Sequence, residues 1–236
     1  ENSPDASEVG TVTATDEDAT KTLTYSIAAG NSLGIFAINS ATGEITVANQ
    51  ANLDRELISS VALTVQVSDR GPGSELIDTA TVMINLTDVN DVTPVVTAGQ
   101  SFSMAENSGT TPELWTVQAT DGDVTATTFQ DWTITTGNTD KDGDLELPFT
   151  LNSSTGVITI NDAGDLDREQ TASFTLSVTV SDGMQTSAVQ TVTITLTDVN
   201  DVTPVVTAGQ SFSMAENSGT TPEVWTVQAT DGDVTP

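Results

Sequence analysis

A seven-residue segment rich in oxygen-bearing side chains occurs twice in the chain and constrains its organisation more than any other feature. It reads Asp88-Val-Asn-Asp-Val-Thr-Pro94 and recurs unchanged as Asp198-Val-Asn-Asp-Val-Thr-Pro204. The proline favours an extended conformation in the residue before it, and clustered Asp and Asn oxygens suit a hard cation. A single copy would be an ordinary polar linker. The identical second copy marks the segment as a connector between repeats.

Alternating apolar residues predict β-strands in both repeats. In the first, every second residue of 61–67 and of 82–86 is apolar, and the same pattern recurs at 174–180 and 192–196 in the second. This period of two is typical of half-buried antiparallel strands. No apolar period of 3.6 residues persists, so the pattern predicts an all-β fold made of tandem β-sandwiches.

The repeats set the expected domain boundaries. We expect a first repeat at 1–93, a second at 94–203 and the opening fragment of a third at 204–236, because the tail copies the start of the second repeat. The first repeat lacks a counterpart of the strand at 100–105. A fragment of about two strands cannot bury a core alone. The sequence therefore leaves the tail frayed, packed on its neighbour or exchanged with another chain.

Charge and composition exclude several classes of function. The chain has 34 acidic and 5 basic residues, with a formal net charge of −29, and contains neither cysteine nor histidine. Nucleic acids and anionic membranes select basic surfaces, so neither is an expected partner. The missing residue types exclude disulfides, a Ser-His-Asp triad and conventional zinc sites. Oxygen ligands remain, and no run of 18 apolar residues predicts a membrane span.

Five acidic motifs recur in the same order in the two repeats. They are Glu-Asn-Ser (Glu1, Glu106, Glu216), Asp-x-Asp (Asp16 and Asp18, Asp121 and Asp123, Asp231 and Asp233), Leu-Asp-Arg-Glu (Asp54 and Glu56, Asp167 and Glu169), Val-Ser-Asp (Asp69, Asp182) and Asp-x-Asn-Asp (Asp88 to Asp91, Asp198 to Asp201). Each alone is most often a solvated loop charge. Their joint recurrence predicts a shared cation site, because adjacent carboxylates repel at about 1–4 kcal/mol per pair without one.

These motifs resemble those of the cadherin repeat, in a bacterial cadherin-like form, over nearly the whole chain. The resemblance implies seven-stranded Greek-key sandwiches joined end to end, with up to three Ca²⁺ ions at each junction. It also implies an extracellular or cell-surface protein, secreted and bacterial. Calcium fits the oxygen-rich motifs better than Mg²⁺, which requires a stricter octahedron.

The resemblance also implies a ligand set for each junction. The first would use Glu1, Asp54, Glu56, Asp88, Asn90, Asp91, Asp121, Asp123 and Asp182, with backbone carbonyls near Val89 and Val92. The second would use Glu106, Asp167, Glu169, Asp198, Val199, Asn200, Asp201, Val202, Asp231 and Asp233. Because the second junction lacks a further Val-Ser-Asp motif, we expect its third ion site to be weaker or incomplete.

A separate acidic loop lies inside the second repeat. It reads Asn138-x-Asp140-x-Asp142-Gly-Asp144-x-Glu146, where the first repeat has only residues 30–35. Its first half resembles the EF-hand loop, with oxygens at alternate positions and a glycine turn. Phe149 stands where that loop requires its twelfth-position glutamate. Calcium binding within the loop and a plain acidic hairpin both remain open.

The expected function is a calcium-dependent structural or adhesion module in which ions stiffen a rod of repeats. Its partner would be another copy of the protein, including homophilic cell adhesion, or an extracellular polysaccharide. The alternative is a carbohydrate-binding module, but Trp115 and Trp132 share strand faces with apolar residues and are expected in the core instead. Catalysis is not expected, because the motif acids have no neighbouring base or cationic cluster.

Overall fold

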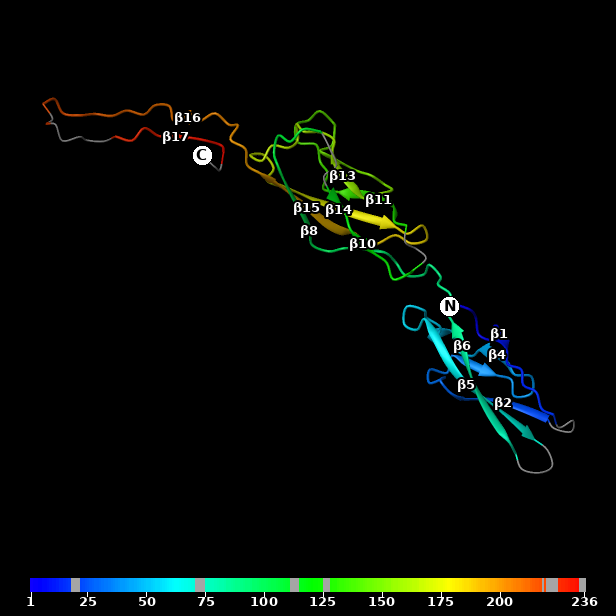
Figure 1. Cartoon of the computed structure of the whole chain (residues 1–236). Helices are drawn as coiled ribbons and strands as arrows, with labels where there is room; N and C mark the ends of the chain where they lie inside the picture. The colour runs from blue at the N-terminus through cyan, green and yellow to red at the C-terminus, as the bar shows by residue number, and fades with distance from the viewer. Residues whose placement is uncertain are drawn as a thin grey trace. The chain divides into compact units, whose positions relative to one another are not determined.

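The structure is a computed structural model that describes residues 1–17, 22–70, 75–110, 115–124, 128–217, 219 and 225–233 (Figure 1). Asp18, which belongs to one of the acidic motifs, lies outside this range. Contacts divide the chain into two compact units, one of residues 1–92 with 122–127 and one of residues 93–121 with 128–236. The expected boundaries at 93 and 203 stay predictions of the repeat pattern.

The first unit is a sandwich of two antiparallel sheets. One has the order β1-β4-β3 and the other β2-β5-β6. The elements are β1 (Glu8–Thr11), β2 (Thr22–Ala29), β3 (Phe36–Ile38), β4 (Glu44–Val47), the 3₁₀ turn η1 (Gln50–Asn52), β5 (Ser60–Arg70) and β6 (Ile77–Asn85). The chain changes sheet after β1, β2 and β4, whereas β3–β4 and β5–β6 are neighbours in one sheet. The turns after β2 and β4 meet at one corner, where the Asn52 side chain donates to the carbonyl of Leu33.

The second unit repeats this arrangement with a larger main sheet. Its sheets have the orders β11-β14-β15-β8 and β12-β13-β9, with a short β10-β7 pair. The strands are β7 (Val95–Val96), β8 (Gln100–Ala105), β9 (Trp115–Thr116), β10 (Ala119–Thr120), β11 (Gln130–Thr136), β12 (Phe149–Leu151), β13 (Val157–Ile160), β14 (Ser173–Ser181) and β15 (Gln190–Thr197). All described pairings are antiparallel except β8 with β15, which run parallel over six paired positions.

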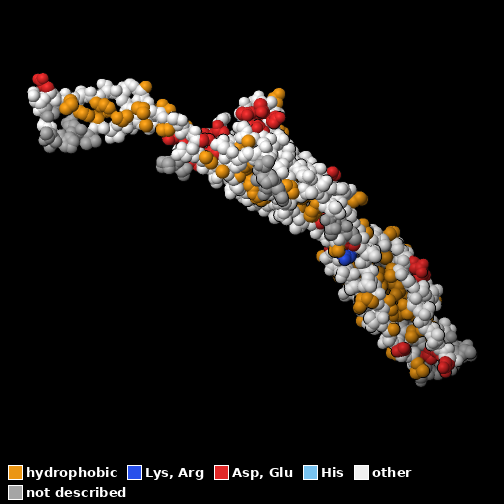
Figure 2. Space-filling model, turned by 45° about the horizontal axis from the view of Figure 1, so that its top comes forward, with side chains coloured by type: hydrophobic (Ala, Val, Ile, Leu, Met, Phe, Trp, Pro, Cys, Tyr) orange, Lys and Arg blue, Asp and Glu red, His pale blue; other side chains and the backbone are white. Residues whose placement is uncertain are grey.

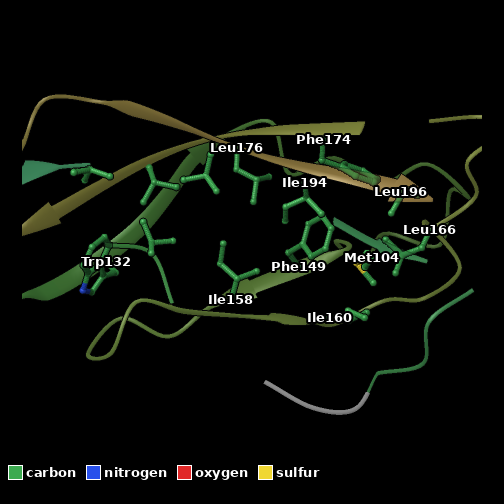
Figure 3. Packing of buried hydrophobic residues seen from close by; sticks show 14 of the residues in the cluster. Met104, Trp132, Phe149, Ile158, Ile160, Leu166, Phe174, Leu176, Ile194 and Leu196 are labelled. Carbon is green, nitrogen blue, oxygen red and sulfur yellow. The ribbon is translucent and has the colours of Figure 1, made fainter. Parts of the chain in front are cut away.

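The alternating residues of the second repeat form its core, as predicted. Phe174, Leu176, Val178 and Val180 are all buried, and so are the three alternating apolar residues of β15. Figure 3 shows Ile158 and Phe149 on one side of the core facing Leu176 and Ile194 on the other. The rings of Phe149 and Phe174 meet edge to face with centroids 5.2 Å apart. The predicted all-β fold of tandem sandwiches is therefore confirmed.

The first unit has a smaller core of the same kind. Val61, Leu63 and Val65 of β5 are buried against Ile45 and other residues of the opposite sheet. Val67, the fourth residue of that alternating set, is only half-buried. Burial at alternate positions is the outcome that a strand with one face on a core must produce.

The two tryptophans predicted in the core differ in burial. Trp132 is buried and contacts Phe129 edge to face. Trp115 is half-buried at the margin of the core, where its ring stacks on Phe102 with centroids 5.0 Å apart. Each ring contributes apolar area to the second repeat, so neither forms an open sugar-binding platform.

The tail contains a short antiparallel pair, β16 (Val205–Val206) with β17 (Ala229–Thr230). Val205, Val206 and Val227 are exposed, as are Phe212 and Met214. The tail therefore has paired strands without a buried core among its described residues. Within the described part of the chain, no helix is long and apolar enough to cross a membrane.

Candidate metal centres

The first cluster of acids is built around Glu1 in the first unit. The Glu1 carboxylate accepts hydrogen bonds from the backbone N–H groups of Arg55, at 2.6 Å, and Val89, at 2.7 Å. These bonds join the Leu-Asp-Arg-Glu motif to the start of the connector. One carboxylate oxygen each from Glu1, Glu56 and Asp91 lies within 4.8 Å of the other two. The structure therefore brings together three of the predicted ligands.

Two neighbouring acids complete this cluster. Asp88 forms an ion pair with the Arg55 guanidinium, at 3.0 Å, and accepts the N–H of Val124 at the same distance. Asp123 accepts the N–H of Val92, at 3.0 Å, and together with Glu56 and Asp88 it forms a second group of oxygens within 4.8 Å. Segment 122–127 belongs to the first compact unit, so these contacts lie within that unit.

The charges of the first cluster act on one another. Burial opposes ionisation of Glu1, but the N–H groups of Arg55 and Val89 hold the pKa of its carboxyl below the usual value. The pKa of Glu56 is raised, first by burial and then by the negative charges of Glu1 and Asp123, although its own backbone N–H lowers it. A cation near Glu56 would favour the ionised form of its carboxyl and so offset the effect of the neighbouring negative charges.

The second repeat builds the same arrangement around Glu106. This glutamate is 2% exposed and accepts the N–H groups of Arg168, at 2.5 Å, and Val199, at 2.7 Å. The Arg168 guanidinium lies 3.2 Å from the Asp198 carboxylate. Oxygens of Glu106, Asp167 and Glu169 lie within 4.8 Å of one another. The pKa of Glu169 is raised, first by burial and then by the negative charges of Glu106, Asp167 and Asp201, although its own backbone N–H lowers it.

The remaining predicted ligands of the second junction lie in turns and in the connector. Asp233 accepts the N–H of Val202, at 3.1 Å, and its own N–H donates to Asp231, at 3.2 Å. Asp167 accepts the N–H of Gln170, at 2.9 Å, which closes the turn of its motif. Asn200 is exposed in the connector. The acids therefore occupy ordered turns rather than free chain.

The other predicted ligands of the first connector fall in both units. Asp54 accepts the N–H of Leu57, at 2.9 Å, and Asn90 is half-buried within the connector. Asp121 and Asp182 belong to the second unit, where Asp182 accepts the N–H groups of Met184 and Gln185, both at 2.7 Å.

Sequence reasoning missed four residues of these clusters. Arg55 and Arg168 neutralise the first aspartate of each connector, and Asn2 and Asn107 donate side-chain hydrogen bonds to Asp91 and Asp201. All four occupy equivalent positions in recurring motifs, which is the signal that could have identified them. The two arginines are notable because the whole chain has only five basic residues.

The donor set fits calcium. The ligands that these clusters offer are carboxylate, amide and backbone oxygens, and calcium accepts six to eight such oxygens in flexible geometry. Each arginine pairs with the first aspartate of its connector, and that aspartate belongs to neither the Glu1–Glu56–Asp91 group nor the Glu106–Asp167–Glu169 group. A divalent ion at such a group would replace mutual repulsion by attraction.

Comparison with protein families identifies the repeats. The cadherin domain model matches residues 1–87 and 100–197. Similar proteins include the protocadherin-like wing polarity protein stan of Drosophila melanogaster, 36% identical over 238 residues, and human protocadherin Fat 4, 33% identical over 241 residues. Each alignment covers 99% of this chain. The chain spans only 6% and 5% of the lengths of these two relatives.

Solved structures share the fold. The human desmocollin-1 ectodomain superposes with a TM-score of 0.70 at 25% identity, covering 99% of this chain and 44% of that one. Repeats 22–24 of mouse cadherin-23 superpose with a TM-score of 0.57 at 22% identity, covering 97% of this chain and 72% of that one.

Proposed function

The chain belongs to the cadherin family, and we propose that it is a calcium-stiffened spacer in an extracellular adhesion protein. In this proposal Ca²⁺ binds the clusters around Glu1 and Glu106 and holds each repeat against the next. The observation that carries the proposal is the repetition of one arrangement, in which a buried glutamate gathers the Leu-Asp-Arg-Glu motif and the connector through two backbone hydrogen bonds.

The ligands proposed for the first junction come from both repeats. Glu1, Glu56 and Asp91 supply the oxygens that lie together in the first unit. Asp121 and Asp182 of the second unit join them on the strength of the repeat pattern and the family resemblance. Calcium at such a junction neutralises carboxylates that would otherwise repel, so its removal converts a stiff connection into a hinge. Extracellular modules bind calcium with dissociation constants of about 10⁻⁴ to 10⁻³ M.

The partner follows from the same proposal. Proteins with similar sequences include protocadherins and a cadherin EGF LAG seven-pass G-type receptor. These relatives support a role in adhesion at a cell surface, through contact with another copy or with a different protein. An extracellular polysaccharide is the second candidate, favoured only by the acidic surface to which calcium could bridge sugar hydroxyls. The bacterial source and the absence of catalysis remain predictions.

Small-angle scattering of the full chain tests the mechanical role. In millimolar Ca²⁺ we expect a narrow range of interrepeat distances, and in chelator we expect a broader one. The variant Glu56→Gln should lose part of the calcium-dependent change, because it removes one charge from the first cluster. The variant Asp78→Asn is the matched control, because it removes an exposed carboxylate of β6 outside the described clusters.

Two results would contradict the proposal. Identical scattering with and without calcium would exclude a stiffening role for the ion. An equal loss of the calcium response in Glu56→Gln and Asp78→Asn would show that total charge, rather than the cluster, controls it.

A further inference from the structure

The loop between β11 and β12 in the second repeat is a longer version of the loop between β2 and β3 in the first. The side-chain amide of Asn138 donates to the carbonyl of Phe149, at 2.7 Å, and accepts its N–H, at 3.2 Å. In the first repeat Asn31 makes the same two bonds to Phe36, at the same distances. Asn138 therefore closes the loop, and the residues between it and Phe149 form an added feature. This loop stands out from the second unit in Figure 1.

The carboxylate of Asp140 accepts backbone hydrogen bonds from two residues of the added loop. One oxygen accepts the N–H of Gly143, at 2.7 Å, and the other accepts that of Leu145, at 2.8 Å. Both donors have positive φ angles, +90° and +77°, which glycine adopts freely and leucine rarely does. These bonds lower the pKa of Asp140. The loop therefore holds an ionised carboxylate in a defined position.

Asp165 approaches the same loop from the turn after β13. It is completely buried, and its Oδ1 accepts the N–H groups of Lys141 and, at 3.1 Å, Asp142. Its Oδ2 is also buried and has no hydrogen-bond partner. A buried carboxylate oxygen without a partner is unfavourable unless a cation or proton satisfies it. This oxygen is direct structural support for a ligand at the loop.

Gly164 allows Asp142 to approach this turn. A Cβ at position 164 would lie 2.3 Å from Oδ2 of Asp142 and 3.3 Å from Oδ1 of Asp162. Any larger residue would therefore displace the Asp142 side chain. Oδ2 of Asp162 is a second buried oxygen without a hydrogen-bond partner. Oxygens of Asp140, Asp142 and Asp165 lie within 4.8 Å of one another.

The electrostatics of the corner between loop 138–148 and turn 161–165 agree with its geometry. The N–H of Asp144 lowers the pKa of Asp142, but burial and the charges of Asp144, Asp162 and Asp165 raise it overall. A group of red side chains marks a projection on this part of the molecule in Figure 2. Several carboxylates thus converge where two segments, distant in sequence, meet.

We propose that this corner of the second repeat binds its own calcium ion between loop 138–148 and turn 161–165. Asp140, Asp142 and Asp165 are the carboxylate ligands, with Asp162 beside them. The site lies within a single repeat and is separate from the clusters around Glu1 and Glu106, so it does not depend on the proposed function. Calcium fits because all of these ligands are carboxylate oxygens, of which it accepts six to eight in flexible geometry. Bound calcium would fix the projecting loop to the body of the repeat.

Calcium titration of the full chain by calorimetry and by ¹H–¹⁵N NMR tests the site. The amides of Gly143 and Gly164 should shift on addition of Ca²⁺. In Asp165→Asn both shifts should be lost, and the number of ions bound should fall by one per chain. This substitution introduces the residue that the first repeat has at the equivalent position, Asn52. Asp142→Asn, at an exposed position, provides the same test with little risk to folding.

Controls separate this site from the junctions. Asp78→Asn should keep both amide shifts and the full number of ions, and Glu56→Gln should keep both amide shifts. Unshifted Gly143 and Gly164 amides in the wild type, or an unchanged ion count in both Asp165→Asn and Asp142→Asn, would overturn the site. Equal affinity for Mg²⁺ would overturn the choice of calcium. If scattering shows no stiffening while these amides shift, the proposed function fails and this site stands.

Discussion

Residues 48–53 of the first repeat and 161–166 of the second form the same turn, since each ends in the leucine of Leu-Asp-Arg-Glu. Asn52 in the first turn donates its side-chain amide to the carbonyl of Leu33, at 2.9 Å. Asp165 in the second accepts backbone N–H groups from the longer loop instead. The frame is thus common to both repeats, while the direction of the hydrogen bonds between turn and loop is reversed.

This difference shows how a repeat can acquire a site without a change of fold. The first corner satisfies its polar groups internally with a neutral amide. The second replaces that amide by a buried carboxylate and surrounds it with further acids, which a cation satisfies in the proposed site. Equivalent turns in the two repeats can therefore carry different polar groups. The two corners should respond differently to calcium and to substitution.

Removal of calcium should produce the largest difference between the repeats. A ligand at 100 times its dissociation constant stabilises the folded state by about 2.7 kcal/mol per site. Because the proposed corner site belongs to the second repeat alone, chelation from a calcium concentration 100 times its dissociation constant should lower the stability of that repeat by about 3 kcal/mol more than that of the first. Amide hydrogen exchange in β5 and β14 measures the two repeats separately. Equal losses of protection would remove the proposed asymmetry.

The substitution Glu106→Gln should destabilise the second repeat by about 1–3 kcal/mol, because one of two backbone N–H groups loses its buried acceptor. Glu1→Gln should have a smaller effect on the first repeat, since Glu1 is 9% exposed and Glu106 only 2%. All three tryptophans lie in the second unit, so their fluorescence during urea unfolding reports on Glu106→Gln, and hydrogen exchange in β5 reports on Glu1→Gln. A larger effect at Glu1 would show that the two clusters are not equivalent.

The reciprocal substitution Asn52→Asp tests whether one carboxylate is enough to create the corner site. It removes the donor to Leu33 and places an acceptor against that carbonyl, so we expect a loss of about 1–2 kcal/mol in the first repeat. No calcium should be gained, because residues 31–35 contain no acid. Calorimetric ion counts and hydrogen exchange in β5 provide the measurement. An additional bound ion would show that the surrounding acids of the second repeat are unnecessary.

The smallest effect is expected from Ala51→Gly in the first repeat. Ala51 occupies the position of Gly164, and the segment 31–35, which stands in place of loop 138–148, contains no acid, so glycine offers no advantage there. The extra freedom of the unfolded chain should cost about 0.4–1 kcal/mol. Hydrogen exchange in β5 would detect this loss, whereas Gly164→Ala should reduce calcium affinity at the corner. A calcium-dependent effect of Ala51→Gly would contradict the distinction between the two turns.

The sequence predicted the strands because their apolar residues alternate, whereas the calcium ligands among the recurring acids stay predictions. Burial at alternate positions follows from strand geometry, as at Leu63 and Leu176, and repetition separated the motif acids from ordinary loop charges. The roles of Arg55 and Arg168 were missed because an arginine inside an acidic motif gives no indication of which carboxylate it contacts.

Asp165 could not be found from the sequence for a different reason. Next to Leu-Asp-Arg-Glu it resembles one more solvated acid, and only the folding of loop 138–148 over the turn after β13 buries it. Asn138 was assigned to an EF-hand-like pattern, but the structure uses it to hold Phe149. The comparison with Asn31 in the first repeat contained that information, since the same Asn-to-Phe contact occurs there without an acidic loop.

The parallel pairing of β8 with β15 has a mechanical consequence. Because the two strands run in the same direction over six paired positions, tension applied at the start of β8 and the end of β15 pulls them past each other along their length. All of the interstrand hydrogen bonds then bear the load together, instead of opening one after another as in a hairpin pulled from its ends. Tension applied at these two strand ends therefore loads the second repeat in shear, with all six paired positions of β8 and β15 resisting extension together.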